Sequence, residues 1–351
     1  MKNIVVIFGG VSVEHDVSII TALKVCKLLR RTYNIIPVYL SLENKFYYLK
    51  DINFSDYNDK NKLVNFGKRI EFLQGSIYYC AGKKLKELFK VDGAINCCHG
   101  GVGESGELAG FLKLNRINLS CSSSNAICLN KYITKQFAKS LGINVIDCEL
   151  VTNNNLEEKL KIIKQVDNKQ FLLKPNTLGS SIGIIKSEKK DLGDNVELLL
   201  HLDGQILVEE YIKNIEELRV AIVNYKNTIC LSEVEKVKLK NDIYSFEDKY
   251  INKLSVSEIP ANISGKIKNQ IFDWAKKLYE GLNLAGVVEF QFFYVKSKDL
   301  LYFNEINAVP KNLSLNLFEP IGITAKMIAE YLIEGKESIK KQTYFESDIL
   351  K

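Results

Sequence analysis

Residues 171–183 read FLLKPNTLGSSIG and combine a strand pattern with a loop that suits an anion. The first five residues are mostly apolar and predict a strand, with Pro175 at its end, where the missing N–H costs least. Glycines and serines in the loop let backbone N–H groups turn toward a phosphate, and Lys174 adds a point charge. The segment does not follow the Walker A pattern, and such a loop taken alone is more often a plain turn. A phosphate site and a simple turn both remain open from this stretch.

A second polar segment, Asn304-Glu305-Ile306-Asn307, lies late in the chain. On a strand, Glu305 and Asn307 project to the same face with side chains about 6–7 Å apart. Carboxylate and amide oxygens at this spacing suit Mg²⁺, which takes few protein ligands and completes its shell with phosphate. An exposed polar strand face is the more common explanation, so the metal interpretation depends on the anion loop upstream.

Three further groups have both a functional and an ordinary explanation. Glu209-Glu210 ends an apolar strand, where a carboxylate could bind ribose or adenine but equally be a solvated strand end. His99 and Glu104 lie in a glycine-rich turn after another strand, although a lone histidine is usually structural. Glu14 follows Gly9-Gly10 and is equally consistent with a favourable charge at a helix start.

The order of predicted elements indicates an α/β protein of several domains. Strand, glycine turn and helix follow one another at residues 3–30, and a chain of 351 residues suggests two or three domains. Apolar strands alternating with helices predict a parallel sheet in the first part. Single elements are expected at 122–141 (a helix) and at 228–237 (a strand), and domain boundaries near residues 121 and 207.

Composition excludes several classes of protein. Forty-eight basic and 42 acidic residues give a net charge of +6, spread over mixed helix-like segments, so a nucleic-acid partner is not expected. Charges interrupt every apolar stretch before the roughly 18 residues that a membrane helix needs, and the start is too short for a secretion signal. The eight cysteines show no zinc spacing, which predicts reduced thiols in a cytoplasmic protein.

The series of motifs resembles the D-alanine–D-alanine ligases of the ATP-grasp superfamily over nearly the whole chain. Seven segments occur in that family's order: IFGGVSVEHDVS, HGGVGESGELAG, LNKYITK, LLKPNTLGSSIGI, VEEYI, YSFEDKY and FNEINAVP. The resemblance implies a three-domain fold with an N-terminal Rossmann-like domain (1–121) and two α+β ATP-grasp subdomains (122–207 and 208–351). It also implies ATP-dependent formation of an acyl phosphate on D-alanine and its transfer to an amine, for peptidoglycan-precursor synthesis by a homodimer.

The resemblance assigns roles by position. The residues implied for ATP are Lys131, Lys174, Gly179, Ser180, Ser181, Glu209, its neighbour Glu210, and Glu216 or Glu217, between which the spacing slips by one. The residues implied for substrate and catalysis are Glu14 for the first ammonium group, His99 beside it, Ser180, and the lid pair Lys249 and Tyr250. Glu305 and Asn307 match two magnesium ligands, for one or two ions.

Several positions depart from the family pattern around the second substrate. The family expects Arg-x-Asp where this chain has Glu289 and Gln291, which replaces an arginine by a carboxylate and a metal carboxylate by an amide. Lys311 stands where a glycine is expected and Asn316 where a serine is expected. Three hypotheses follow: Lys311 takes over the arginine's role, the acceptor is a different amine, or the chain is a degenerate nucleotide-binding protein without ligase activity.

Overall fold

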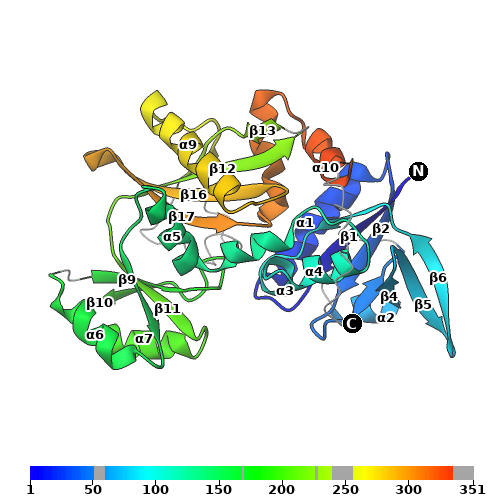
Figure 1. Ribbon diagram of the computed structural model, residues 1–351, viewed down its shortest axis with the longest axis horizontal. Coiled ribbons are helices and arrows are strands. Elements are labelled where there is room, and N and C mark those ends of the chain that lie inside the picture. Colours follow the sequence, from blue (N-terminus) through cyan, green and yellow to red (C-terminus); the bar gives the residue numbers. More distant parts are fainter. Residues whose placement is uncertain (51–59, 168–169, 226–227, 239–255, 335–351) are drawn as a thin grey trace, which may run out of the picture.

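The computed structural model describes residues 1–50, 60–167, 170–225, 228–238 and 256–334 (Figure 1). Three sheets follow one another along the chain; Figure 1 shows the first at the right, the second at the lower left and the third between them at the upper centre. The predicted lid pair, Lys249 and Tyr250, lies outside the described residues. No helix within these ranges is long and apolar enough to cross a membrane.

The N-terminal sheet has the order β6-β5-β4-β3-β2-β1-β7. Its strands are β1 (Asn3–Gly9), β2 (Asn34–Leu40), β3 (Phe46–Tyr48), β4 (Lys68–Leu73), β5 (Ser76–Ala81), β6 (Lys84–Lys90) and β7 (Gly93–Asn96). Strand β1 pairs in parallel with β2 and β7, as expected, but the pairs from β2 to β6 are antiparallel. The expectation of a parallel sheet is therefore correct only for β2, β1 and β7, the last three strands at one edge. Loops as short as the two residues between β4 and β5 allow only antiparallel hairpins.

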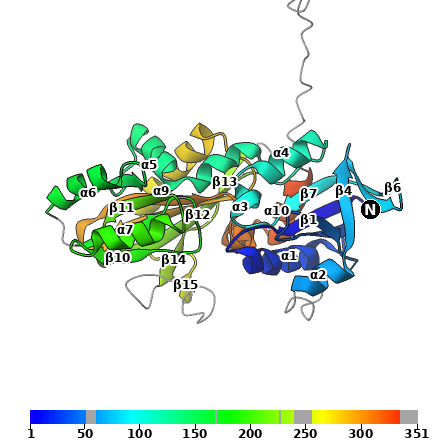
Figure 2. The same ribbon diagram turned by 90° about the horizontal axis from the view of Figure 1, so that it is seen from below.

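Helices cover both faces of this sheet (Figure 2). They are α1 (His15–Leu29), α2 (Lys60–Phe66), α3 (Gly101–Glu104), α4 (Glu107–Leu114) and the C-terminal α10 (Ala325–Glu334). Because side chains alternate along a strand, Val6 of β1 packs in one core with α1 and α10, whereas Val5 packs in another with α4. Gly9 ends β1 with φ 94°, and a Cβ there would lie 2.3 Å from the Leu40 carbonyl oxygen, so only glycine fits this turn.

The central sheet is fully antiparallel in the order β10-β9-β11-β8. It consists of β8 (Cys148–Thr152), β9 (Gln170–Pro175), β10 (Ile185–Glu188) and β11 (Gln205–Glu210), with α6 (Leu156–Gln165) and α7 (Leu192–Leu200) packed on it. The predicted domain boundary after residue 207 falls inside β11, and the domain limits stay predictions.

The segment before this sheet contains two helices where one was expected. They are the 3₁₀ helix η2 (Ser123–Leu129) and α5 (Lys131–Ser140). Asn130 between them has an extended backbone (φ −89°, ψ 99°), and its side chain accepts a 2.9 Å hydrogen bond from the Ile133 N–H. The continuous helix was therefore wrong because an asparagine cap restarts it at Lys131.

The third sheet has the order β15-β14-β12-β16-β17, with β13 paired to β12. Its strands are β12 (Glu216–Tyr225), β13 (Thr228–Leu231), β14 (Glu235–Lys238), β15 (Val256–Glu258), β16 (Val288–Val295) and β17 (Leu300–Asn307). The other elements are α9 (Gly265–Gly281) and the 3₁₀ segments η3 (Lys296–Lys298), η4 (Lys311–Leu317) and η5 (Glu319–Ile321). The single strand expected at 228–237 is two strands, β13 and β14, which pair with different parts of β12.

Candidate active site

Two adjoining pockets share Gln291 and Glu305 of the third sheet in their linings. We call the first the sheet pocket, because the central and third sheets form its walls. Its polar lining consists of Lys131, Lys174, Ser181, Glu210, Glu217, Gln291, Asn304 and Glu305. The second, which we call the junction pocket, is also lined by the N-terminal domain. Its charged and polar lining includes Glu14, His99, Glu104, Ser180, Arg219, Glu235, Glu289, Gln291, Glu305, Asn307, Lys311, Ser314 and Asn316.

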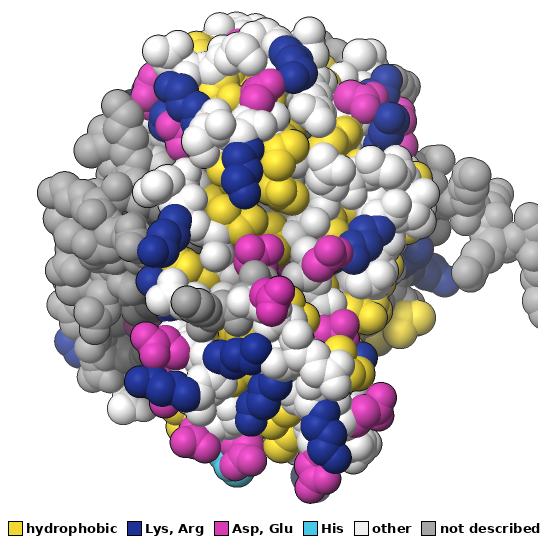
Figure 3. Space-filling view, turned by 90° about the vertical axis from the view of Figure 1, so that its left-hand side faces the viewer, with side chains coloured by type: hydrophobic (Ala, Val, Ile, Leu, Met, Phe, Trp, Pro, Cys, Tyr) yellow, Lys and Arg dark blue, Asp and Glu magenta, His cyan; other side chains and the backbone are white. Residues whose placement is uncertain are grey.

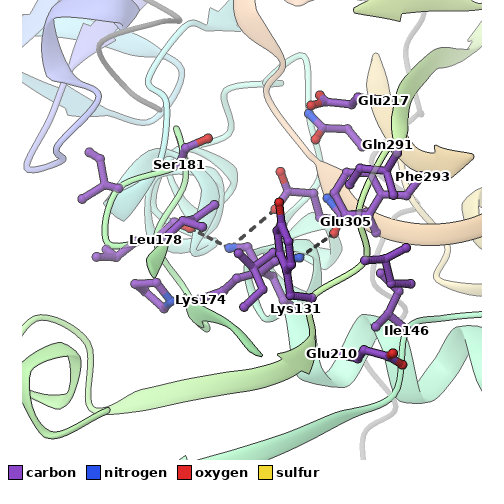
Figure 4. A pocket seen from close by; sticks show the side chains of 18 residues that line it. Lys131, Ile146, Lys174, Leu178, Ser181, Glu210, Glu217, Gln291, Phe293 and Glu305 are labelled. Carbon is purple, nitrogen blue, oxygen red and sulfur yellow. Dashed lines mark hydrogen bonds and ion pairs between the residues drawn. The ribbon is translucent and has the colours of Figure 1, made fainter. Parts of the chain in front are cut away.

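Two lysines reach into the sheet pocket from different elements (Figure 4). Lys131 starts α5, and its Nζ donates to the Leu178 carbonyl oxygen at 2.6 Å and lies 3.7 Å from Glu305. Lys174 on β9 lies 3.0 Å from the Asn304 amide oxygen and 2.7 Å from Glu209. The pocket thus presents two ammonium groups next to a carboxylate, which suits a polyphosphate and a divalent cation.

The glycine–serine loop is held in an unusual conformation. Ser180 and Ser181 have φ 55° and 60°, and the Ile182 N–H donates to the Gly179 carbonyl oxygen at 3.1 Å. Two left-handed residues inside such a turn correspond to a type I′ turn, which is costly for serine and is found where the surroundings enforce it. Ser180 Oγ donates to Glu14 of the N-terminal domain, so the loop closes over the junction pocket.

Strand alternation resolves the uncertain glutamates at the pocket wall. Glu217 lines the sheet pocket, whereas Glu216 pairs with Lys236 at 2.6 Å. Glu210 also lines the pocket, but the Glu209 side chain is fully buried and lies outside its lining. We therefore expect Glu210 and Glu217, rather than Glu209 and Glu216, to face a nucleoside.

Glu209 instead joins two lysines in the interior. Its carboxylate lies 2.7 Å from both Lys135 Nζ and Lys174 Nζ, and Lys135 is fully buried. Burial alone would raise the pKa of Glu209, but the two ammonium groups outweigh it and lower the pKa to about 2. The cluster fixes Lys174 in position at the pocket edge.

The oxygen donors for a metal lie on neighbouring strands. Gln291 on β16 pairs directly with Glu305 on β17, and Asn307 pairs with Glu289. Gln291 and Asn307 both donate their amide N–H groups to Glu289 Oε1 at 3.2 Å. Their amide oxygens have no hydrogen-bond partner among the described residues and are free to act as ligands.

The oxygen atoms of Glu305, Gln291 and Asn307 suit a hard divalent cation. The described part of the chain contains no group of three or more His, Cys, Asp or Glu side chains placed to hold a metal. One carboxylate, Glu305, and two amide oxygens, from Gln291 and Asn307, are nevertheless the kind of ligands that Mg²⁺ takes together with phosphate. A single ion fits this set better than two, because Gln291 brings no charge.

His99 is held in place from both ring nitrogens. Nδ1 lies 2.6 Å from the Val309 carbonyl oxygen and must donate to it, and Nε2 lies 2.8 Å from Thr21 Oγ1. Burial lowers the pKa of His99, although Glu14 opposes this effect. Because both ring nitrogens are hydrogen-bonded, His99 holds Val309 and Thr21 in place at the wall of the pocket.

The nearby Glu104 is a second unusual acid. It accepts a 2.9 Å hydrogen bond from the Gly100 N–H. Burial, and next to it the charge of Glu14, raise the pKa of Glu104 to about 8. The proton on Glu104 lets two carboxyl groups share one pocket.

Another wall of the junction pocket is η4, which contributes Lys311 and Asn316. Residues 312–314 have φ between 45° and 54°, a left-handed bend, and the Asn312 N–H donates to Thr21 Oγ1 at 3.3 Å. The bend turns Ser314 inward, where its hydroxyl donates to Glu289 Oε2 at 2.5 Å. Glu289 therefore accepts three internal hydrogen bonds, from Gln291, Asn307 and Ser314.

Sequence reasoning missed several side chains of this site. Arg219 lies two residues after Glu217, so the alternation of β12 could have placed it on the same face. Asn304 directly precedes Glu305, and its contribution to the pocket was not predicted. No sequence pattern indicates the inward orientation of Ser314, because it depends on the left-handed bend. The apolar wall of the sheet pocket, including Ile146, Leu172, Ile182 and Phe293, comes from four different segments.

The site and fold together define the class of protein. Two sheets that enclose a pocket with paired lysines, a serine loop and a metal-ligand set are the arrangement of ATP-grasp ligases, which use ATP and form ADP. The chain belongs to the D-alanine–D-alanine ligase family: residues 3–122 match the model described as D-ala D-ala ligase N-terminus, and residues 137–334 the D-ala D-ala ligase C-terminus.

Full-length relatives and solved structures agree with this assignment. A D-alanine--D-alanine ligase of Thermosipho melanesiensis is 34% identical and covers 100% of this chain and 99% of its own, and one of Helicobacter acinonychis is 30% identical over 98% of each. The D-Alanine-D-Alanine Ligase structure from Helicobacter pylori superposes with a TM-score of 0.76, 26% identity and coverage of 94% and 98%. The structure of VanG D-Ala:D-Ser Ligase from Enterococcus faecalis superposes with a TM-score of 0.77 and 27% identity, and the match covers 95% of this chain and 98% of that one.

Proposed function

We propose that the chain joins two D-amino acids for peptidoglycan-precursor synthesis. The carboxylate of a first D-alanine takes the γ-phosphoryl group of ATP, and the amine of a second D-alanine or of D-serine attacks the acyl phosphate with loss of phosphate. The observation that carries this proposal is the contact of Ser180 with Glu14. It brings the phosphate loop directly against a carboxylate that can hold the ammonium group of the first substrate.

The nucleotide fits the sheet pocket. Lys131 and Lys174 would bind its phosphates, Glu217 its ribose, and the apolar wall around Phe293 its base. Glu305, Asn307 and Gln291 would hold Mg²⁺, which neutralises charge on the phosphates when bound. Lys131 and Lys174 would stabilise the same charge, because phosphoryl transfer depends mainly on positioning and electrostatics.

The acceptor is an ordinary D-amino acid in this proposal, and Glu289 gives the reason. A free carboxylate at this position would repel the acceptor's carboxylate or favour a cationic acceptor. Glu289 is instead buried and accepts hydrogen bonds from Gln291, Asn307 and Ser314. Lys311 and Asn316 line the same pocket and would bind the acceptor's carboxylate.

The test is ATP turnover with defined amino acids. We expect D-alanine to stimulate release of ADP and phosphate, with a D-alanyl dipeptide as the product in mass spectrometry, and L-alanine to fail. D-serine and a panel of other amines as second substrates would identify the acceptor. Tight ATP binding with no turnover for any pair would instead support a nucleotide-binding protein without ligase activity.

Two coarser properties accompany this proposal. A cytoplasmic location is consistent with the eight cysteines, all of which are free thiols. A homodimer through the N-terminal domain follows from the family resemblance, and light scattering of the purified chain tests it. The face of the molecule in Figure 3 carries basic and acidic side chains interspersed around exposed apolar ones.

We predict that Gly179→Ala lowers kcat/KM by about 10- to 100-fold with little loss of stability. A Cβ at Gly179 would lie 2.7 Å from Glu14 Oε2, so the loop must move away from Glu14, the residue proposed to bind the first substrate. Misplacing reacting groups by about 1 Å has effects of this size. Steady-state kinetics with D-alanine measure it.

The matched control is Gly204→Ala, since a Cβ there meets nothing within 4 Å. It should leave kcat/KM within about twofold, because surface substitutions without contacts have small effects. Equal activity of both variants would show that the loop and Glu14 need not touch during turnover.

A further inference from the structure

Arg219 occupies a distinctive place in the third sheet. It pairs with Gln291 of β16 and, on its other side, with Glu235 of β14, while Gln291 pairs with Glu305. One row across four strands therefore reads Glu235, Arg219, Gln291, Glu305, and all four side chains line the junction pocket. The arginine thus stands on the same face as the metal-ligand set and one strand away from it.

Hydrogen bonds fix the guanidinium group of Arg219 but leave some of its N–H donors without a partner among the described residues. Its Nε and Nη2 donate to Glu217 Oε1 at 2.8 and 2.5 Å. Its Nη1 is 4.0 Å from Glu235 Oε2, too far for a hydrogen bond, and the side chain is 18% exposed. The two N–H groups of Nη1 therefore make no hydrogen bond within the described residues and are available to a ligand.

The charge balance of the junction pocket requires such a cation. The described side chains that line it include five carboxyl groups, from Glu14, Glu104, Glu235, Glu289 and Glu305, against two basic groups, from Arg219 and Lys311. A surplus of carboxylates repels a phosphoryl group unless a cation lies directly at its binding position. Burial lowers the pKa of Arg219, but the surrounding glutamates, above all Glu217, outweigh this and raise it, so its charge is constant.

The two cations divide the pocket between them. Lys311 belongs to η4, which packs between α1 and the sheet, whereas Arg219 belongs to the sheet itself, beside Gln291 and Glu305. Glu217, which Arg219 holds, lines the sheet pocket, so the Glu217–Arg219 pair connects the proposed ribose position with the phosphoryl end of the nucleotide.

We propose that Arg219 binds the phosphoryl group in transfer through Nη1, and that it donates hydrogen bonds to oxygens of the γ-phosphate and of the acyl phosphate. Arg219 neither accepts nor gives a proton. The bond between the γ-phosphorus and the ADP oxygen breaks, and a bond between that phosphorus and an oxygen of the substrate carboxylate forms. This inference rests on the proposed ATP-dependent function and assigns it a residue from β12.

The test compares nucleotides that differ only in the γ-phosphate. In isothermal titration with Mg²⁺, Arg219→Gln should weaken binding of a non-hydrolysable ATP analogue by about 10- to 100-fold and of ADP by less than about threefold, since a charge-assisted hydrogen bond is lost only with the former. Arg219→Lys, which keeps the charge but not the fork, should recover part of the loss. Arg69→Gln, at an exposed arginine of β4, should change neither.

Each outcome decides the question. Equal weakening of both nucleotides by Arg219→Gln would mean that Arg219 acts only by holding Glu217, and would overturn the proposal, as would no weakening at all. Thermal unfolding of each variant identifies a folding defect, and Arg219→Lys then carries the comparison. If the wild-type chain binds neither nucleotide, the proposed function itself fails.

Discussion

Replacing Glu305 by glutamine should lower kcat by about 1,000-fold and raise the Mg²⁺ concentration needed for half-maximal activity. Glu305 is the one carboxylate in the donor set with Gln291 and Asn307, so the variant leaves three neutral amides to face the cation. Stabilisation of phosphoryl charge by a bound metal amounts to several kcal/mol, which corresponds to a rate effect of this size. Turnover measured against Mg²⁺ concentration checks both parts.

The matched control for this variant is Glu149→Gln. Glu149 lies on β8 of the central sheet, where it pairs with Lys159 at 2.7 Å, outside the lining of both pockets. Its replacement should leave kcat and the Mg²⁺ requirement within about twofold. A Glu305→Gln variant that behaves like this control would rule out Glu305 as the metal ligand.

Glu209→Gln should destabilise the protein by about 3–5 kcal/mol at pH 7. The substitution removes the carboxylate that pairs with Lys135 and Lys174 in a buried cluster, and an unpaired buried charge has a penalty of this order. Denaturant unfolding measures the loss. Asp147→Asn breaks the exposed pair with Lys139 and should have an effect below about 1 kcal/mol.

The same cluster predicts a pH dependence. Folding lowers the pKa of Glu209 from 4.5 to about 2, so its contribution is complete above the unfolded value and is lost as the pH falls toward 2. Protonated glutamic acid resembles glutamine in shape and charge. The stability difference between wild type and Glu209→Gln should therefore shrink from pH 5 toward pH 2; a constant difference would contradict the ion-pair explanation.

The sequence predicted the local elements of the site well and its long-range contacts poorly. Strand alternation in FNEIN placed Glu305 and Asn307 on one face, and β17 extends through Asn307 as this required. The order of motifs predicted a three-domain ATP-grasp architecture, and the three sheets and the likeness to solved D-alanine–D-alanine ligase structures agree with it. By contrast, Glu209 looked like a ligand-binding strand end, because nothing in the chain order indicates that Lys135 is buried against it.

The charge exchange around Glu289 shows the same limit. The sequence indicated that an expected arginine had become a carboxylate, and it left open compensation by Lys311, a different acceptor, or a chain without ligase activity. The structure gives Glu289 three internal donors and places a cation, Arg219, on the neighbouring strand β12. Arg219 lies beside Gln291 because of the register in which β12 pairs with β16, and this register cannot be read from the sequence.

The C-terminal helix α10 has a consequence for biosynthesis. Ile328 and Ile333 of α10 share one hydrophobic core with Ile4 and Val6 of β1, so the first domain is completed by residues that leave the ribosome more than 300 positions later. Domains formed from contiguous sequence can fold during translation. Here the central sheet, residues 148–210, can form its core on the nascent chain, while the N-terminal domain remains unfinished until synthesis is nearly over.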